Sequence, residues 1–156
     1  MKTWMVSCSL LVGAVSCNDD DAPPVDRRSR AGIAQVAPPI DLEAPPKDAT
    51  STASGLAYKK LVASERGAQP ARGGTALIHY TGWSQRTGAT FFTTRGNPQP
   101  IALEIAHASS AFAEVLPLLH KGETAMVWVP PSRGMVEAVV YQIEVVDVVA
   151  PAAARR

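Results

Sequence analysis

The sequence predicts one α+β domain in which a curved antiparallel sheet lies against a single short helix. Short apolar or alternating runs, each bounded by glycine or proline, fill residues 55–149 and are typical of antiparallel strands. Only one segment has the 3.6-residue period of a helix. The chain has 156 residues, of which 46% are hydrophobic, so it has room for one ordinary core.

Six segments are predicted to be strands. They are residues 56–63, 75–80, 90–94, 101–105, 124–129 and 139–148. Glycine, proline and asparagine separate them and favour turns, because these residues adopt the backbone angles that turns require. The turns are predicted at Gly73-Gly74, Thr87-Gly88, Gly96-Asn97-Pro98, Lys121-Gly122 and Arg133-Gly134.

The predicted helix rests on apolar side chains at helical spacing. Phe112, Val115, Leu116 and Leu119 fall at positions i, i+3, i+4 and i+7, after the capping candidates Ser109 and Ser110. Pro117 lies inside this pattern, where its missing amide and its ring cost about 3 kcal/mol. We therefore expect a kinked or irregular helix that covers the concave face of the sheet.

Four parts of the chain differ in composition. Residues 1–17 have the basic start and apolar run of a leader, and residues 150–156 form a tail. Residues 18–54 carry acidic residues and proline pairs with few large apolar side chains, which predicts a disordered, extended tether. Residues 55–149 form the predicted domain.

Cys17 ends the sequence Ala14-Val15-Ser16-Cys17, which resembles the lipobox of bacterial lipoproteins. In such proteins the cysteine is lipidated and attaches the chain to a membrane. A plain signal peptide and an uncleaved apolar start are the alternatives. Either form of export predicts a location in the cell envelope, and the mature domain would have no disulfide because Cys8 and Cys17 both lie in the leader.

Several functional classes find no support. The formal net charge of +1 and the lack of a basic cluster argue against nucleic-acid binding. His79, His107 and His120 are scattered without carboxylates at ligand spacing, so we expect no metal site. No nucleophile elbow, phosphate-binding loop or dinucleotide motif occurs, and no cofactor is expected.

The strongest motif is His79-Tyr80-Thr81-Gly82, which follows the apolar run Ala76-Leu77-Ile78. Further motifs come after it in order: Gly88-Ala89-Thr90-Phe91, Arg95-Gly96-Asn97-Pro98, Leu119-His120-Lys121-Gly122 and Tyr141-Gln142-Ile143. In this order and spacing, residues 54–149 resemble the FKBP-type peptidyl-prolyl cis-trans isomerases. The resemblance implies a half-barrel of antiparallel strands wrapped on one helix, with an apolar cleft that receives a proline side chain.

The resemblance also implies the residues of the site. Tyr80 matches the cleft tyrosine, Phe91 a wall phenylalanine and Tyr141 an aromatic wall on the last strand. Ile101 stands where the family often has phenylalanine, and Phe112 where tryptophan forms the pocket floor. Without the resemblance, these aromatic side chains could simply be core residues of a β-rich domain.

The sequence departs from the family at three further places, one of which is residues 108–111, where small residues replace an apolar pair and a glycine that lead into the helix. Phe92 replaces an aspartate that commonly follows the wall phenylalanine, and the loop before the last strand shrinks to residues 132–136, without the usual rim tyrosine. These departures predict a shallower cleft without its usual rim donor.

Three functions follow from these observations. The first is an isomerase that assists exported proteins by acting on their Xaa-Pro segments. The second is a catalytically weakened FKBP-like binding or chaperone module of the cell envelope. The third is an envelope lipoprotein whose domain serves assembly alone, with Phe92 or Met135 filling the cleft.

Overall fold

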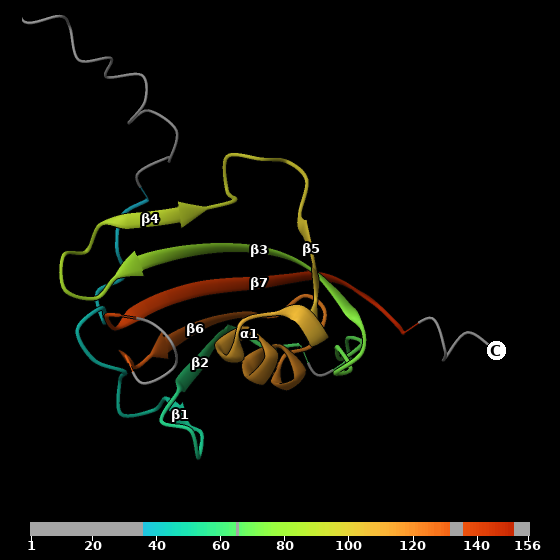
Figure 1. The fold of residues 1–156 in the computed structure, drawn as a ribbon, viewed down its shortest axis with the longest axis horizontal. Coiled ribbons are helices and arrows are strands. Elements are labelled where there is room, and N and C mark those ends of the chain that lie inside the picture. The colour runs from blue at the N-terminus through green and yellow to red at the C-terminus, as the bar shows by residue number, and fades with distance from the viewer. Residues whose placement is uncertain (1–35, 65, 132–135, 152–156) are drawn as a thin grey trace, which may run out of the picture.

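The computed structural model of the protein describes residues 36–64, 66–131 and 136–151. Its strands form one antiparallel sheet in the order β1-β2-β6-β7-β3-β4, and β5 pairs with β3 off this path. Figure 1 shows the sheet curving around α1, so the predicted α+β class is confirmed. The elements are β1 (Thr50–Ser51), β2 (Ala57–Val62), β3 (Thr75–Ser84), β4 (Thr90–Thr93), β5 (Ile101–Glu104), α1 (Ser110–Val115), β6 (Thr124–Val129) and β7 (Val139–Val149), with short 3-10 turns at Ile105–His107 and Leu116–Leu118.

All six predicted strands are present, with ends that shift by a few residues. The largest difference is β3, which was expected to end at Tyr80 but continues to Ser84. The extension carries Gly82 and Trp83, which pair with Tyr141 and Val140 of β7. Pairing to β7 on one side and β4 on the other satisfies the backbone hydrogen bonds beyond the apolar run.

The helix is short because of Pro117. The α-helix ends at Val115, and residues Leu116–Leu118 continue as a 3-10 turn with the proline near its start. A proline lacks an amide donor, but at the first turn of a helical segment no intrahelical acceptor is needed. The predicted irregularity at Pro117 is therefore confirmed, and Leu116 and Leu119 still reach the core.

The main core fills the space between α1 and the concave face of the sheet. Side chains alternate along each strand, so Val127 of β6 and Ile143 of β7 face the helix while their neighbours face outward. Phe112, Val115 and Leu116 cover them from the helical side. This core fixes the strands from which the candidate site is built.

A second apolar cluster lies on the outer, convex face of the sheet. It contains Ala57, Trp83, Met126, Trp128 and Val140. Residues 36–49, named here the outer strap, run past the end of β3 and the beginning of β7 in Figure 1. Val36, Leu42 and Ala49 of the strap pack on the cluster.

The outer strap falls within residues 18–54, which the sequence analysis assigned to a tether. From residue 36 onward this part of the chain lies on the sheet, and β1 at Thr50–Ser51 pairs with β2. The outer strap has no helix or strand of its own. It is held on the sheet because two of its backbone carbonyls accept hydrogen bonds from tryptophan side chains. The leader, Cys17 and residues 18–35 lie outside the described residues.

One carboxylate is buried in the fold. Glu123, at the turn before β6, is 1% exposed and accepts hydrogen bonds from the amides of Ser64 (2.9 Å) and His120 (2.8 Å). The Lys60 ammonium lies 2.9 Å from its Oε2 atom. These contacts join the end of β2 to the turn that begins β6.

Candidate functional site

Four of the five predicted site residues meet on the helical side of the sheet. Tyr80 comes from β3, Phe91 from β4, Phe112 from α1 and Tyr141 from β7. The Tyr141 ring lies at the centre, with centroid distances of 5.1 Å to Phe112, 5.8 Å to Phe91 and 6.0 Å to Tyr80. All three contacts are edge-to-face, the geometry that the aromatic quadrupole favours.

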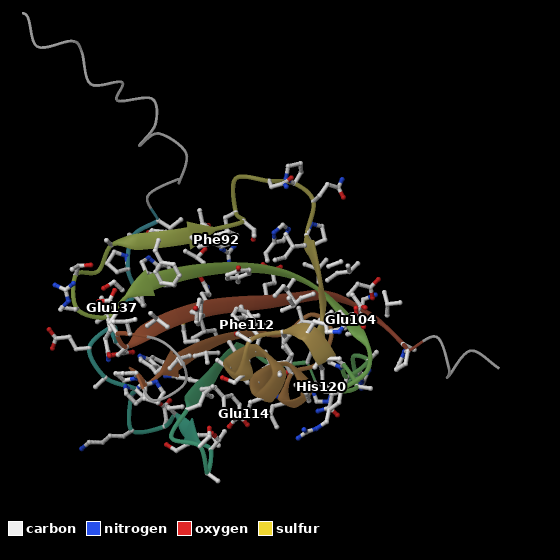
Figure 2. All side chains as sticks on the ribbon, viewed as in Figure 1. Phe92, Glu104, Phe112, Glu114, His120 and Glu137 are labelled. Carbon is white, nitrogen blue, oxygen red and sulfur yellow. The ribbon has the colours of Figure 1, made fainter. Side chains whose placement is uncertain are left out.

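Phe92 is a fifth ring of this group, which the sequence analysis named only as a side chain that could fill the cleft. Its ring stacks on Tyr80 with a centroid distance of 4.7 Å and an interplanar angle of 19°. Figure 2 shows Phe92 beside β4 and Phe112 between α1 and the sheet. The five side chains, Tyr80, Phe91, Phe92, Phe112 and Tyr141, are called the aromatic cluster below.

A β-bulge places both phenylalanines of β4 on one face. Gly82 pairs with Phe92, but the next residue, Trp83, pairs with Thr90, so Phe91 is an extra residue in β4. In a regular strand, neighbouring side chains would point to opposite faces. Nothing in the sequence of β4 marks the bulge, which is why the contact between Phe92 and Tyr80 was not foreseen.

The aromatic cluster is closed at its base and open at its rim. Phe112 and Tyr141 are each 7% exposed, whereas Phe91 is 40% and Phe92 39% exposed. Beside Phe91 lies a cavity of about 200 Å³, which Val136, Glu137 and Val139 complete. Large aromatic side chains with this exposure above a packed base form a surface suited to an apolar ligand.

The two phenols of the cluster stay protonated at neutral pH. Burial raises the pKa of Tyr80, and burial together with the neighbouring Tyr80 raises the pKa of Tyr141 to about 12. Neither hydroxyl makes a hydrogen bond with another residue in the described part of the chain. Both are therefore hydrogen-bond donors that a ligand could use.

Comparison with known proteins assigns the domain. Residues 67–145, just over half of the chain, match the family of FKBP-type peptidyl-prolyl cis-trans isomerases. The chain belongs to this family. The predicted family is thus confirmed, and all five rings of the aromatic cluster lie within the matched FKBP region.

Three solved structures share the FKBP fold. FkpA from Escherichia coli has a TM-score of 0.60 at 19% identity, and the match covers 67% of this chain and 53% of that one. A peptidyl-prolyl cis-trans isomerase from Pseudomonas syringae pv. tomato has a TM-score of 0.60 at 18% identity, covering 69% and 86%. The N-terminal domain of FKBP42 from Arabidopsis thaliana has a TM-score of 0.56 at 20% identity, covering 69% and 99%.

At these identities the likeness to solved structures is one of fold. The chain spans about half the length of FkpA. A search of curated proteins finds no match. Within the described residues, no helix is long and apolar enough to cross a membrane.

Ile101 is the predicted site residue that does not join the aromatic cluster by a ring contact. It begins β5, pairs with Ile78 of β3 and packs, half-buried, against the main core. As an aliphatic side chain it can border the FKBP cleft but adds no aromatic face. The shortened loop lies outside the described residues from 132 to 135, and Val136, its last residue, borders the cavity beside Phe91.

Gly82 is the residue whose substitution tests the packing of the cluster. A Cβ atom at this position would lie 2.6 Å from Phe91 Cζ and 2.9 Å from Tyr141 Cε1. The half-exposed Phe91 ring can move away, but buried Tyr141 cannot, so we expect Gly82→Ala to separate the two rings. Aromatic ring shifts in NMR spectra should change at Phe91 and Tyr141. The comparison variant is Gly96→Ala, where a Cβ atom would meet nothing within 4 Å; unchanged ring shifts in Gly82→Ala would contradict this packing.

Proposed function

We propose that this FKBP domain catalyses the cis–trans isomerisation of Xaa-Pro bonds in exported proteins. The observation that carries the proposal is the aromatic cluster, in which Phe91 and Phe92 stand about 40% exposed above the buried rings of Phe112 and Tyr141. A prolyl ring is apolar and compact and can lie against such a surface. Family membership supports the reaction type.

The chemistry needs an apolar site more than a nucleophile. The planar amide is held by partial double-bond character, with a barrier of about 18–20 kcal/mol to rotation. Moving the amide out of water disfavours its charge-separated planar form relative to the twisted form, in which that charge separation is lost. Each 1.36 kcal/mol of preference for the twisted form gives about a tenfold increase in rate.

The phenols of Tyr80 and Tyr141 can supply polar contacts to the substrate. Both are protonated at neutral pH and have no hydrogen-bond partner among the described residues. A carbonyl oxygen of the bound segment could accept a hydrogen bond from either one. This would provide a donor although the sequence lacks the family's rim tyrosine.

The proposed location is the cell envelope, where a lipid on Cys17 would attach the chain to a membrane. The leader pattern of residues 1–17 supports export, and the lipobox-like Ala14-Val15-Ser16-Cys17 supports the anchor. Xaa-Pro segments of proteins that fold after export would then be the substrates. Metabolic labelling with a fatty acid, lost on Cys17→Ser, would test the anchor.

A binding module with weakened catalysis is the second candidate. Phe92 supports it, because its ring lies 4.7 Å from that of Tyr80 and covers one face that a prolyl ring could otherwise use. In this case peptides would bind without faster isomerisation. The assembly protein with a filled cleft would neither bind nor isomerise such peptides.

Exchange NMR spectroscopy on a short Xaa-Pro peptide separates these candidates. With the full chain we expect faster cis–trans exchange, and a rate that stays constant between about pH 6 and pH 9 because both phenols remain protonated. Saturable binding without faster exchange would favour the binding module. If the protein at high concentration neither bound the peptide nor accelerated its exchange, both the isomerase and the binding module would be contradicted.

A further inference from the structure

A five-residue sequence, Ala-Pro-Pro-x-Asp, occurs three times before the FKBP domain. The copies are residues 22–26, 37–41 and 44–48, with Val25, Ile40 and Lys47 at the variable position. The second and third copies lie in the outer strap, on the opposite face of the sheet from the aromatic cluster. The contacts of these two copies show which side chains of the sheet lie beside the motif.

Trp128 of the outer cluster holds the second copy, and Trp83 holds the residue before it. Trp128 Nε1 donates to the carbonyl oxygen of Asp41 (2.7 Å), and Trp83 Nε1 donates to that of Val36 (2.9 Å), just before the copy begins. Extended proline-rich segments commonly bind aromatic surfaces in this way, because their carbonyls are free to accept hydrogen bonds. Ile40 is fully exposed, which explains why the variable position tolerates different side chains.

The third copy uses the same part of the sheet. Its Asp48 pairs with Lys59 at 2.9 Å, and its Pro45 borders a small cavity together with Trp128. Asp41 of the second copy also borders a cavity with Lys59. Both copies therefore place a proline near Trp128 and an aspartate near Lys59.

This surface is not filled by the two copies. A cavity of about 280 Å³ remains between the outer strap and the sheet. Its apolar wall comes from Trp83, Met126, Trp128 and Leu61, and its polar groups are Lys59, Asp41 and Gln142. Ala37 and Pro39 of the strap complete the lining.

We propose that the first copy, residues 22–26, binds in this cavity. It repeats the motif whose second copy accepts a hydrogen bond from Trp128 and whose third copy pairs with Lys59. Ten residues separate Asp26 from Ala37, which borders the cavity, and ten extended residues span up to about 33–36 Å. A linker of this length gives an effective concentration in the millimolar range, so weak contacts suffice.

Charge complementarity supports the same occupant. Arg27 and Arg28 follow the first copy directly. Asp41 borders the cavity and forms no salt bridge with a described residue. An arginine beside the bound copy would pair with this carboxylate.

Limited trypsin digestion of the full chain tests the proposal, because cleavage after Arg27 and Arg28 requires a free segment. We expect cleavage there to be about tenfold slower than in a synthetic peptide of residues 18–34. Pro23→Ser/Pro24→Ser should restore the rate of the free peptide. It should also shift the indole N–H NMR signals of Trp83 and Trp128, whereas Ser29→Ala, outside the motif, should change neither result.

A second variant locates the binding site without altering the motif. Gln142→Trp would fill the cavity from the β7 side and should also abolish protection of Arg27 and Arg28. Circular dichroism would show that the sheet remains folded. Cleavage as fast in the wild-type chain as in the peptide, or protection that survives Gln142→Trp, would overturn the proposal.

Discussion

Replacing Glu123 with alanine is expected to lower the free energy of unfolding by about 3–5 kcal/mol. The side chain is 1% exposed and accepts hydrogen bonds from Ser64, His120 and Lys60. Its removal leaves two amides and an ammonium group without their acceptor, and such unpaired groups are costly in a protein interior. Urea denaturation monitored by tryptophan fluorescence measures the change.

Glu104→Ala provides the matched control, since its side chain is 55% exposed and pairs only with nearby His107. Exposed ion pairs contribute about 0–1 kcal/mol, so this variant should unfold at nearly the wild-type urea concentration. Equal losses in the two variants would contradict the role assigned to Glu123.

The pKa of Glu123 predicts how the stability of the fold changes in acid. Burial raises its pKa, but hydrogen bonds from Ser64, Lys60 and His120 and the charge of Lys60 outweigh burial and lower the pKa to about 2. A carboxyl whose pKa is lower in the folded state stabilises the fold above its unfolded pKa, and this stabilisation is lost as the pH falls. Wild-type stability should therefore decrease between about pH 4.5 and pH 2 by about 3 kcal/mol, and Glu123→Gln should lack this component.

Phe91→Ala is expected to reduce kcat/KM for an Xaa-Pro peptide by about 10–100-fold, while the free energy of unfolding falls by about 1–2 kcal/mol. Phe91 is 40% exposed, so truncation removes ligand surface together with the edge-to-face contact to Tyr141. It also opens the rim to water, which weakens the apolar environment that favours the twisted amide. Exchange spectroscopy gives the rate, and thermal unfolding gives the stability.

Val62→Ala is the control for Phe91→Ala. Val62 is a similarly exposed hydrophobic residue, at 53%, and lies on β2 outside the aromatic cluster. Its truncation should leave the isomerisation rate unchanged. If Phe91→Ala also left the rate unchanged, the substrate would not bind at this rim.

The sequence predicted the strands and helix well because each depends on local patterns. The alternation of apolar residues in β3, β6 and β7 predicts which face of the sheet each side chain occupies. Pro117 marks the place where the α-helix ends. The family resemblance predicted that four rings would meet, those of Tyr80, Phe91, Phe112 and Tyr141. The apolar pattern of the strands and helix alone does not predict these contacts. Strand and helix patterns show which face a side chain occupies but not which rings meet.

Two features could not be predicted for physical reasons. The bulge at Phe91 depends on how β4 pairs with β3, and residue pairing between strands is not encoded in the local pattern of either one. The outer strap has the composition of an unfolded tether, yet it packs because Trp83 and Trp128 present indole donors to its carbonyls. Two tryptophans spaced far apart in the sequence gave no sign that they share one surface.

The strand order has a consequence for how the chain folds as it is made. β3 lies between β7 and β4, and its longest pairing joins residues 75–84 to residues 139–149. A ribosome releases β7 only after every other described strand, so the centre of the sheet stays empty until synthesis reaches that point. Until then the nascent polypeptide cannot complete its hydrophobic interior, because the faces of β3 and β6 that pair with β7 have no partner strand.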